Sequence, residues 1–449
     1  MKDSIRYLSL CGLLGYGYSP VSLENALKQE LDFIGVDAGS TDPGPYYLGS
    51  GKGFVKRLQI KRDLSLILKE AKSRSIPLII GSAGGSGAKP HVKNVLEIIK
   101  EIVGEQGLSL KTAVIYADLS ADFLKQAAAG HLFSCGGSPE FDPACVDKLS
   151  NPVAQFGTDP IIEALKLNPD VIVSGRCCDT AVFAAYPIWK GFNPGLALHA
   201  AKIAECGALC ARPVGANDSL VVEMFADHFT VEPPNPERVC TPESVAAHSL
   251  YEQPDPNCFY EPEGKIDLSE CRFEALSPRK VKVSGSRLIP AGRVTTKLEG
   301  VVSRGFRSIT IAGVRDPAAI RQLDFIEAGV RRAVAQSASF VEEGNYSLRF
   351  YRYGVDAVTG GNEAPGTLPR EAALLIEAIA ETGEKADALI ALARSKMLHQ
   401  GFPGRKATAG NLAFPFSPSD FSGGEVYEFA LYHLTDLPLK FTPQLMVLQ

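Results

Sequence analysis

The chain has 449 residues, more than a single hydrophobic core usually holds, so we expect at least two domains. Hydrophobic residues make up 45% and charged residues 22%, which excludes a largely disordered or fibrous protein. The formal net charge of −5 provides no overall basic field, so we expect no nucleic-acid partner.

Neither the first residues nor the internal segments indicate a membrane or secretory role. Residues 1–7 lack the apolar stretch of a signal peptide, and the apolar runs at 77–80 and 171–173 are far shorter than the roughly 20 residues that span a bilayer. The 10 cysteines contain no C-x-x-C pair and are interpreted mainly as buried free thiols. We therefore expect a cytoplasmic protein with no membrane partner.

The first 190 residues repeat one pattern, in which a short apolar run ends in a loop and an amphipathic stretch follows. Strands are predicted at 7–11, 33–36, 77–80, 113–116 and 171–173, and helices at 21–30, 62–73 and 93–103. β-branched runs that alternate with helices are typical of a parallel sheet covered on both faces. The prediction is an α/β fold with a mostly parallel, doubly wound sheet.

The pattern weakens from 192 to about 290, and a second regular region follows. It contains predicted strands at 308–312, 347–353 and 426–433, and predicted helices at 318–337, 371–380 and 385–398. We therefore expect two domains: an N-terminal α/β ligand-binding domain at 1–290 and a smaller C-terminal α/β domain at 291–449.

Two glycine-rich loops follow predicted strands. The loop at 12–17 resembles a phosphate-binding turn, but its spacing is neither G-x-G-x-x-G nor a P-loop, and its glycines could simply allow a tight strand-to-helix turn. The loop at 81–87 carries four glycines and two serines, as an anion-binding nest of backbone amides would, although a structural turn explains it equally well.

Three aspartates, Asp37, Asp118 and Asp179, follow predicted strands. If those strands are parallel neighbours, the carboxylates meet at the sheet edge where α/β proteins bind ligands. They could act as general bases or bind a divalent metal, and N-capping of a helix is the alternative for each.

Arg176, Cys177 and Cys178 lie in the loop that ends at Asp179. Arg176 could clamp a substrate carboxylate or form an ion pair with Asp179, and one of the two thiols could be reactive or simply buried. Zinc-ligand spacings and the G-x-S-x-G nucleophile motif are absent from the sequence, so a structural zinc site and an α/β-hydrolase have no support.

The chain resembles the acyclic terpene utilisation (AtuA) family. The signature G-R-x-x-D-[ST]-A is matched by SGRCCDTA at 174–181, preceded by QFGTDPIIEAL at 155–165. Further matches are TPESV at 241–245, PRKVKVSG at 278–285, GRKATAGN at 404–411, AFPFSPSD at 413–420 and VYEF at 426–429. The loops at 12–17 and 37–42 depart from the family pattern, which indicates a divergent branch with a different ligand.

The resemblance implies an enzyme of small-molecule catabolism. The first hypothesis is a lyase or hydratase that acts on a branched unsaturated carboxylic acid or its CoA thioester, an anionic small molecule. The second is a non-catalytic ligand-binding subunit that works with a small partner protein. A third, phosphoryl transfer, would require magnesium and a nucleotide. We expect a homo-oligomer, and the sequence specifies neither a cofactor nor a metal.

The candidate site follows from these loops. Asp37, Arg176 and Asp179 are the predicted catalytic residues, with an aspartate removing a proton and Arg176 holding the anion. The predicted substrate-binding residues are Gly15, Gly17, Ser40, Thr41, Ser82, Gly84, Gly85, Ser86, Cys177 and Asn411. Asn411 is expected to leave the small domain and complete the cleft, with an interdomain connector as the alternative.

Overall fold

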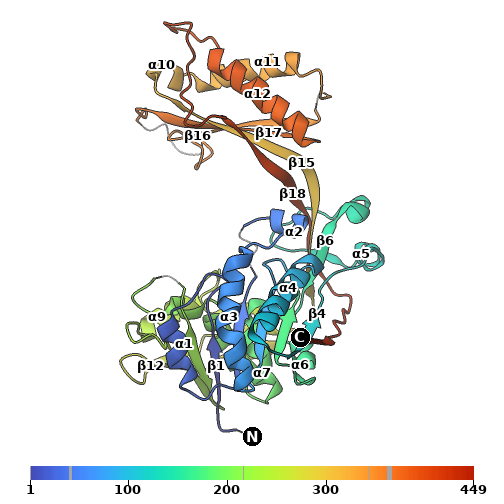
Figure 1. Cartoon of the computed structure of the whole chain (residues 1–449), viewed down its shortest axis with the longest axis vertical. Helices are drawn as coiled ribbons and strands as arrows, with labels where there is room; N and C mark the ends of the chain where they lie inside the picture. Colours follow the sequence, from blue (N-terminus) through green and yellow to red (C-terminus); the bar gives the residue numbers. More distant parts are fainter. Residues whose placement is uncertain (1, 40–42, 216, 343, 362–366) are drawn as a thin grey trace. The chain divides into compact units, whose positions relative to one another are not determined.

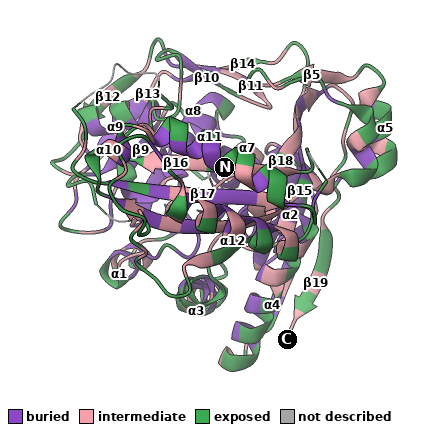
Figure 2. Cartoon of the chain, turned by 90° about the horizontal axis from the view of Figure 1, so that it is seen from above, coloured by how far each residue is buried: buried purple, intermediate pink, exposed green. Residues whose placement is uncertain are grey.

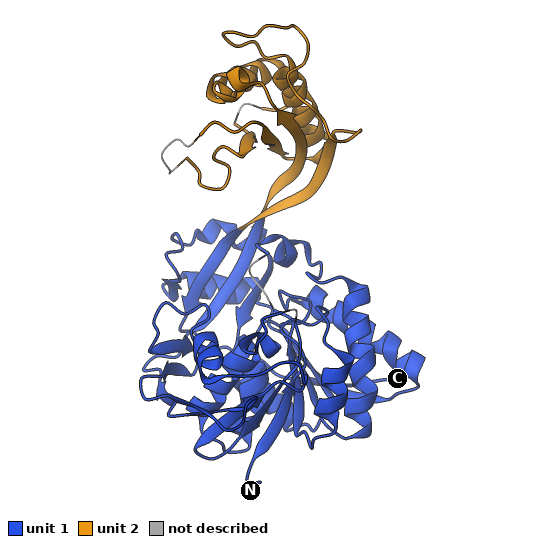
Figure 3. Cartoon of the chain, turned by 90° about the vertical axis from the view of Figure 1, so that its left-hand side faces the viewer, with its two compact units in different colours: residues 1–302, 429–449 blue, residues 303–428 orange. Residues whose placement is uncertain are grey.

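The protein divides into two compact units in a computed structural model that describes residues 2–39, 43–215, 217–342, 344–361 and 367–449. Unit 1 comprises residues 1–302 and 429–449, and unit 2 comprises 303–428 (Figure 3). These compact units differ from the predicted division at 290 and 291, because residues 429–449 return to unit 1. The expectation of two independent domains stays a prediction.

Unit 1 is built on a ten-stranded mixed sheet with the strand order β12-β13-β9-β8-β1-β2-β3-β7-β4-β19. Its five central strands are parallel: β1 (Ile5–Ser9), β2 (Phe33–Asp37), β3 (Leu78–Gly81), β7 (Val171–Ser174) and β4 (Leu110–Ile115). The antiparallel strands are β8 (Leu220–Met224), β9 (His228–Glu232), β13 (Val281–Ser284), β12 (Arg272–Ala275) and β19 (Gln444–Leu448).

The prediction of a mostly parallel sheet was therefore wrong outside the centre. Residues 225–227 join β8 to β9 in a tight hairpin, and such a short connection permits only antiparallel pairing. Residues 281–283 of β13 alternate between apolar and polar as a half-exposed strand does, but alternation alone does not identify the strand with which β13 pairs.

Helices cover both faces of the central strands. On one face, α3 (Arg57–Ser73) and α4 (Lys89–Gln106) lie side by side (Figure 1) and share a hydrophobic cluster with Leu8, Ile34 and Val173. On the other face, Tyr7 and Phe33 stack on each other, and Tyr7 also stacks on Phe183 of α7 (Asp179–Trp189). In Figure 2, α4 shows buried residues along one side and exposed residues along the other, as an amphipathic helix does.

Shorter elements complete unit 1. The helices are α1 (Pro20–Leu27), α2 (Tyr46–Ser50), α5 (Ala121–Ala128), α6 (Asp159–Leu165), α8 (Pro194–Ala204) and α9 (Pro242–Ser249), with 3₁₀ turns at Pro143–Lys148 and Gly207–Cys210. The strands β10 (Cys258–Glu261), β11 (Gly264–Asp267) and β14 (Arg287–Pro290) form a separate three-stranded sheet.

Unit 2 packs α10 (Pro317–Ile320), α11 (Leu323–Ser337) and α12 (Gly383–His399) with antiparallel strands. These strands are β16 (Tyr346–Tyr353), β17 (Ala372–Ala380) and most of β15 (Thr296–Val314) and β18 (Asp420–Thr435), in a sheet that also includes β5 (Leu132–Ser134), with β6 (Ser150–Gln155) paired to β15.

The helix predicted at 371–380 is the strand β17, so that prediction was wrong. Its alanines, leucines and glutamates favour a helix, but β17 lies between β16 and β15 and buries Leu374, Ile376 and Ala378 at alternate positions. Pairing with a strand on each edge and burial of these side chains therefore outweigh the helix propensity of the segment. No helix in the described ranges has the length and apolarity needed to span a bilayer.

Candidate functional site

Asp37, the last residue of β2, lies in a cavity at the carboxyl ends of the central strands. The cavity has a volume of about 250 Å³ and is also lined by Gly39, Arg176 and Asp179. Asp37 Oδ2 accepts a hydrogen bond from the Gly39 amide at 2.9 Å, whereas Oδ1 has no hydrogen-bond partner among the described residues. Burial and the nearby charge of Asp179 raise the pKa of Asp37 well above its usual value, which favours the protonated form.

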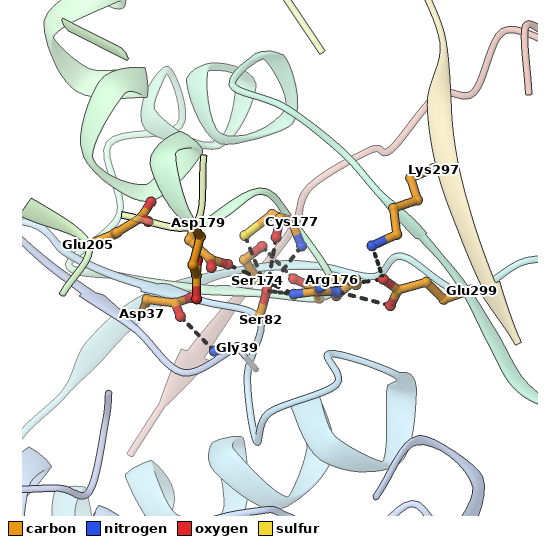
Figure 4. A network of polar contacts seen from close by, with 12 residues as sticks. Asp37, Gly39, Ser82, Ser174, Arg176, Cys177, Asp179, Glu205, Lys297 and Glu299 are labelled. Carbon is orange, nitrogen blue, oxygen red and sulfur yellow. Dashed lines mark hydrogen bonds and ion pairs between the residues drawn. The ribbon is translucent and has the colours of Figure 1, made fainter. Parts of the chain in front are cut away.

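Arg176 follows β7 and is almost fully buried, with Glu299 of β15 as its main partner. Its Nε donates to Glu299 Oε2 at 3.1 Å and its Nη2 donates to Oε1 at 3.4 Å. Lys297 Nζ lies 2.8 Å from the same carboxylate. Figure 4 shows Lys297 and Glu299 on one side of Arg176 and Asp37, Asp179 and Glu205 on the other. Arg176 and Lys297 therefore share the Glu299 carboxylate, and Asp179 provides Arg176 with a second carboxylate.

Asp179 is the first residue of α7 and faces the same cavity as Asp37. Its Oδ1 is 3.9 Å from Arg176 Nη1, a longer separation than that between Arg176 and Glu299. Burial raises the pKa of Asp179, and the positive charges of Arg176 and Lys202 oppose that rise. The ion pair that the sequence left open is thus present, but as a secondary contact of Arg176.

Lys202 and Glu205 add a second ion pair at the border of the cavity. Lys202 Nζ is 2.6 Å from Glu205 Oε1 and 3.8 Å from Glu252 Oε2. Burial raises the pKa of Glu205 to about 8, because it outweighs the opposing charge of Lys202 and is reinforced by Asp179.

A larger cavity of about 750 Å³ adjoins the first one, and Asp179, Glu205 and Glu252 line both. We call the 250 Å³ space the inner cavity and the 750 Å³ space the outer chamber. Besides the shared residues, the outer chamber is lined by Tyr260, Glu261, Lys265, Ile289, Arg293, Lys297 and Leu434, among others. All lining residues belong to unit 1.

The loop at 81–87 supports Arg176 rather than lining either cavity. Ser82 Oγ accepts hydrogen bonds from the Cys177 amide at 3.2 Å and from Arg176 Nη1 at 3.4 Å, and it donates to the Cys177 carbonyl at 3.1 Å. Gly87 has a φ of +64°, and a Cβ atom there would lie 2.2 Å from the Arg176 backbone nitrogen. The glycine is therefore required for the close approach of two loops.

The predicted binding residues Gly84, Gly85 and Ser86 belong to this same turn. The Gly85 amide donates to the Ser82 carbonyl at 3.0 Å, and the Gly84 carbonyl accepts from the Phe54 amide at 3.0 Å. None of the three lines the inner cavity or the outer chamber. Their role as substrate-binding residues stays a prediction.

The loop at 12–17 binds an anion that the protein itself supplies. The amides of Gly15 and Gly17 donate to Asp63 Oδ2 at 2.8 and 3.1 Å. This carboxylate occupies the place that the sequence analysis gave to a ligand, so the two glycines order the loop internally. Other residues of the loop, Gly12, Leu13 and Tyr16, line the inner cavity.

The remaining predicted residues are distributed as follows. Burial raises the pKa of the Cys177 thiol to about 11, which disfavours a reactive thiolate at neutral pH. Asp118 Oδ1 accepts from the Lys89 amide at 2.9 Å, at the first residue of α4, but the N-cap residue of α4 is Ala88 and that of α5 is Ser120, so Asp118 is not an N-cap. Ser40 and Thr41 lie outside the described residues. Asn411 belongs to unit 2, where its amide donates to the Leu398 carbonyl at 3.0 Å.

The sequence analysis missed Lys202, Glu205 and Glu299. A signal existed for the first two, since Lys202 and Glu205 lie three residues apart at the end of the apolar helix α8, where burial of a charge requires a partner. Glu299 carried no such signal, because it follows Arg176 by 123 residues. Within the part of the chain that the structure describes, no group of three or more His, Cys, Asp or Glu side chains could hold a metal ion.

Comparison with known protein families gives a match over most of the chain. The model of the family described as acyclic terpene utilisation family protein AtuA matches residues 49–417. The matched range contains Arg176, Asp179, Glu205 and Glu299, whereas Asp37 precedes it. Neither a curated protein nor a solved structure gives a significant match.

Proposed function

The chain belongs to the acyclic terpene utilisation (AtuA) family, and from this premise we propose that it is a catabolic lyase or hydratase acting on a branched unsaturated carboxylic acid or its thioester. The observation that carries the proposal is the pair of carboxyl groups, Asp37 and Asp179, in one small cavity. Both have a raised pKa, and among the described residues a cation lies within ion-pair distance of Asp179 but not of Asp37. Such a pair can hold one proton between two sites.

The two carboxyl groups differ in environment, and this difference assigns their roles. Arg176, at 3.9 Å, favours the ionised form of Asp179, which serves as the general base. Asp37 is 3% exposed and has no ion pair among the described residues, whereas the Asp179 side chain is 39% exposed, so the protonated form of Asp37 serves as the general acid.

In the hydration direction, Asp179 takes a proton from water while the water oxygen bonds to the β-carbon of the double bond. The π electrons move to the α-carbon, which receives the proton of Asp37. Asp179 then carries the proton and Asp37 the negative charge, and proton exchange with solvent restores both. The reverse sequence eliminates water.

Turnover by the purified chain tests the proposal. We expect hydration of short branched enoates or enoyl thioesters, with deuterium incorporated at the α-carbon in D₂O and seen by NMR. Asp37→Asn and Asp179→Asn should each reduce turnover at least about 100-fold, the usual contribution of a general acid or base. Asp118→Asn is the matched control, since Asp118 also lies near the end of a central strand but lines neither cavity.

Two outcomes would contradict the proposal. One is wild-type turnover that both aspartate variants retain. The other is turnover that appears only after a small partner protein is added and that is unaffected by either substitution, which would favour the non-catalytic subunit.

A further inference from the structure

Among its described lining residues, the inner cavity has no cationic side chain without a protein carboxylate as its partner. Arg176 is the one cation among its described lining residues, and Glu299 already binds it through two hydrogen bonds. Lys202, at the border, is paired with Glu205 at 2.6 Å. The same cavity is lined by the carboxyl groups of Asp37, Asp179, Glu205 and Glu252. A ligand carboxylate placed here would lose its hydration and lie beside the ionised carboxylate of Asp179, without an unpaired cation to compensate.

The outer chamber, in contrast, is lined by four cations (Lys202, Lys265, Arg293 and Lys297) as well as by carboxyl groups. Lys265 of β11 lines it and has no ion pair among the described residues. Arg293 also lines it, with a side chain that is 58% exposed despite an ion pair with Asp436. Tyr260, Ile289 and Leu434 supply apolar surface along the chamber, and the first two are strongly exposed for apolar residues.

Size supports the same division. Small-molecule sites usually have volumes of about 300–1,000 Å³. The inner cavity, at about 250 Å³, falls below that range and accommodates only a small group. The outer chamber, at about 750 Å³, falls within it. A ligand that reaches the inner cavity therefore leaves most of its length in the outer chamber.

We infer that Lys265 and Arg293 form an anion-binding rim that holds the distal negative charge of an elongated ligand, while the ligand's uncharged reacting end enters the inner cavity. The rim thus replaces Arg176 as the anion-binding element. The ligand class is an apolar chain with a terminal anion, either the phosphates of a carrier such as coenzyme A or the distal carboxylate of a chain. Of the two substrate forms proposed above, this favours the thioester over the free conjugated acid, whose carboxylate would enter the inner cavity with the double bond. The assignment of the reacting end rests on the proposed function, whereas the rim does not.

Binding measurements without turnover test the rim. The probes are coenzyme A, which carries phosphates, and octanoate, which carries a carboxylate on an apolar chain, each titrated calorimetrically into the wild-type protein. We expect at least one probe to bind, with an affinity that falls as ionic strength rises. Lys265→Gln and Arg293→Gln should each weaken that binding about tenfold, as expected for loss of one charge-assisted contact. The probe that responds identifies the source of the anion.

Two controls isolate the rim from the catalytic cavity and from general charge. Lys93→Gln removes an exposed lysine of α4 that lines neither cavity and should leave binding unchanged. Asp37→Asn should also leave probe binding intact, even if it abolishes turnover. Thermal unfolding confirms that each variant is folded.

The inference is overturned if neither probe binds the wild-type protein, or if both rim variants bind as the wild type does. Rim-dependent binding without any wild-type turnover would count against the proposed reaction alone.

Discussion

Replacing Glu299 by glutamine should lower the free energy of unfolding by about 3 kcal/mol at pH 7. Burial alone would raise the pKa of Glu299, which is 2% exposed, but the charges of Arg176 and Lys297 outweigh burial and lower that pKa to about 2. The magnitude follows from the difference between this value and the ordinary value of 4.5, since each pH unit corresponds to about 1.36 kcal/mol of stability.

The sign of the pH dependence follows from the lowered pKa. The ionised carboxylate stabilises the folded state, so its contribution is complete above about pH 4.5, the unfolded value. It is lost progressively as the pH falls from there towards 2. The stability difference between wild type and Glu299→Gln should therefore be constant from pH 6 to 8 and shrink in acid.

Urea unfolding followed by tryptophan fluorescence measures the free energy of unfolding of unit 1, which contains Glu299. Trp189 is the one tryptophan of the chain, and it lies at the end of α7. Trp189 and Glu299 both belong to unit 1. Glu101→Gln is the matched control, because Glu101 also pairs with two cations, Arg57 and Lys61, but on the surface. A loss below about 1 kcal/mol for Glu299→Gln at pH 7 would refute the assignment of a strong buried pair.

Four further outcomes are expected. Gly87→Ala should destabilise unit 1 by several kcal/mol in thermal melts, because the added methyl group would collide with the Arg176 backbone. The control Gly104→Ala in α4 has open space around the added methyl group and should stabilise the protein by about 1 kcal/mol, so equal melting temperatures of the two variants would contradict the prediction. Asp63→Ala removes the acceptor of two amide hydrogen bonds and should cost about 1.5–3 kcal/mol in urea unfolding. Because the folded pKa of Glu205 is raised to about 8, wild-type stability should fall as the pH rises from 4.5 through 8, and Glu205→Gln should flatten that slope. Turnover should decline with rising pH as Asp37 loses its proton, and an unchanged profile in Asp118→Asn would confirm that Asp118 is not the titrating acid.

The sequence was sufficient to predict that Asp37 and Asp179 would meet, but it also placed Asp118 with them, which lines neither cavity, and it did not indicate how the resulting charges would be balanced. The apolar runs before Asp37 and Arg176 identified two buried strands, and parallel strands necessarily bring their carboxyl ends to one edge. The charge partner Glu299 comes from β15, beyond the predicted domain boundary at 290. Pairing between segments so far apart in the chain leaves no periodic signal in a single sequence.

Glycine content was a reliable sign of tight backbone geometry and an ambiguous sign of ligand binding. Gly15 and Gly17 do present amides to a carboxylate, but the carboxylate is that of Asp63, from α3. Gly87 is required by the backbone of Arg176. A nest that binds a ligand and a nest that binds its own chain have the same local sequence, since both need positive φ and converging amides.

Because the edge strand β19 follows unit 2 in the chain, the large sheet of unit 1 can be completed only after unit 2 has been synthesised. β19 pairs with β4, Gln444 lying opposite Val114, although all of unit 2 separates them in the chain. Domains tend to fold as they leave the ribosome, from the N-terminus onward, and contacts distant in sequence form slowly. The outer edge of β4 therefore stays unpaired while residues 303–428 are translated. During that interval the nascent chain presents an open strand edge, where a chaperone would protect it from pairing with another chain.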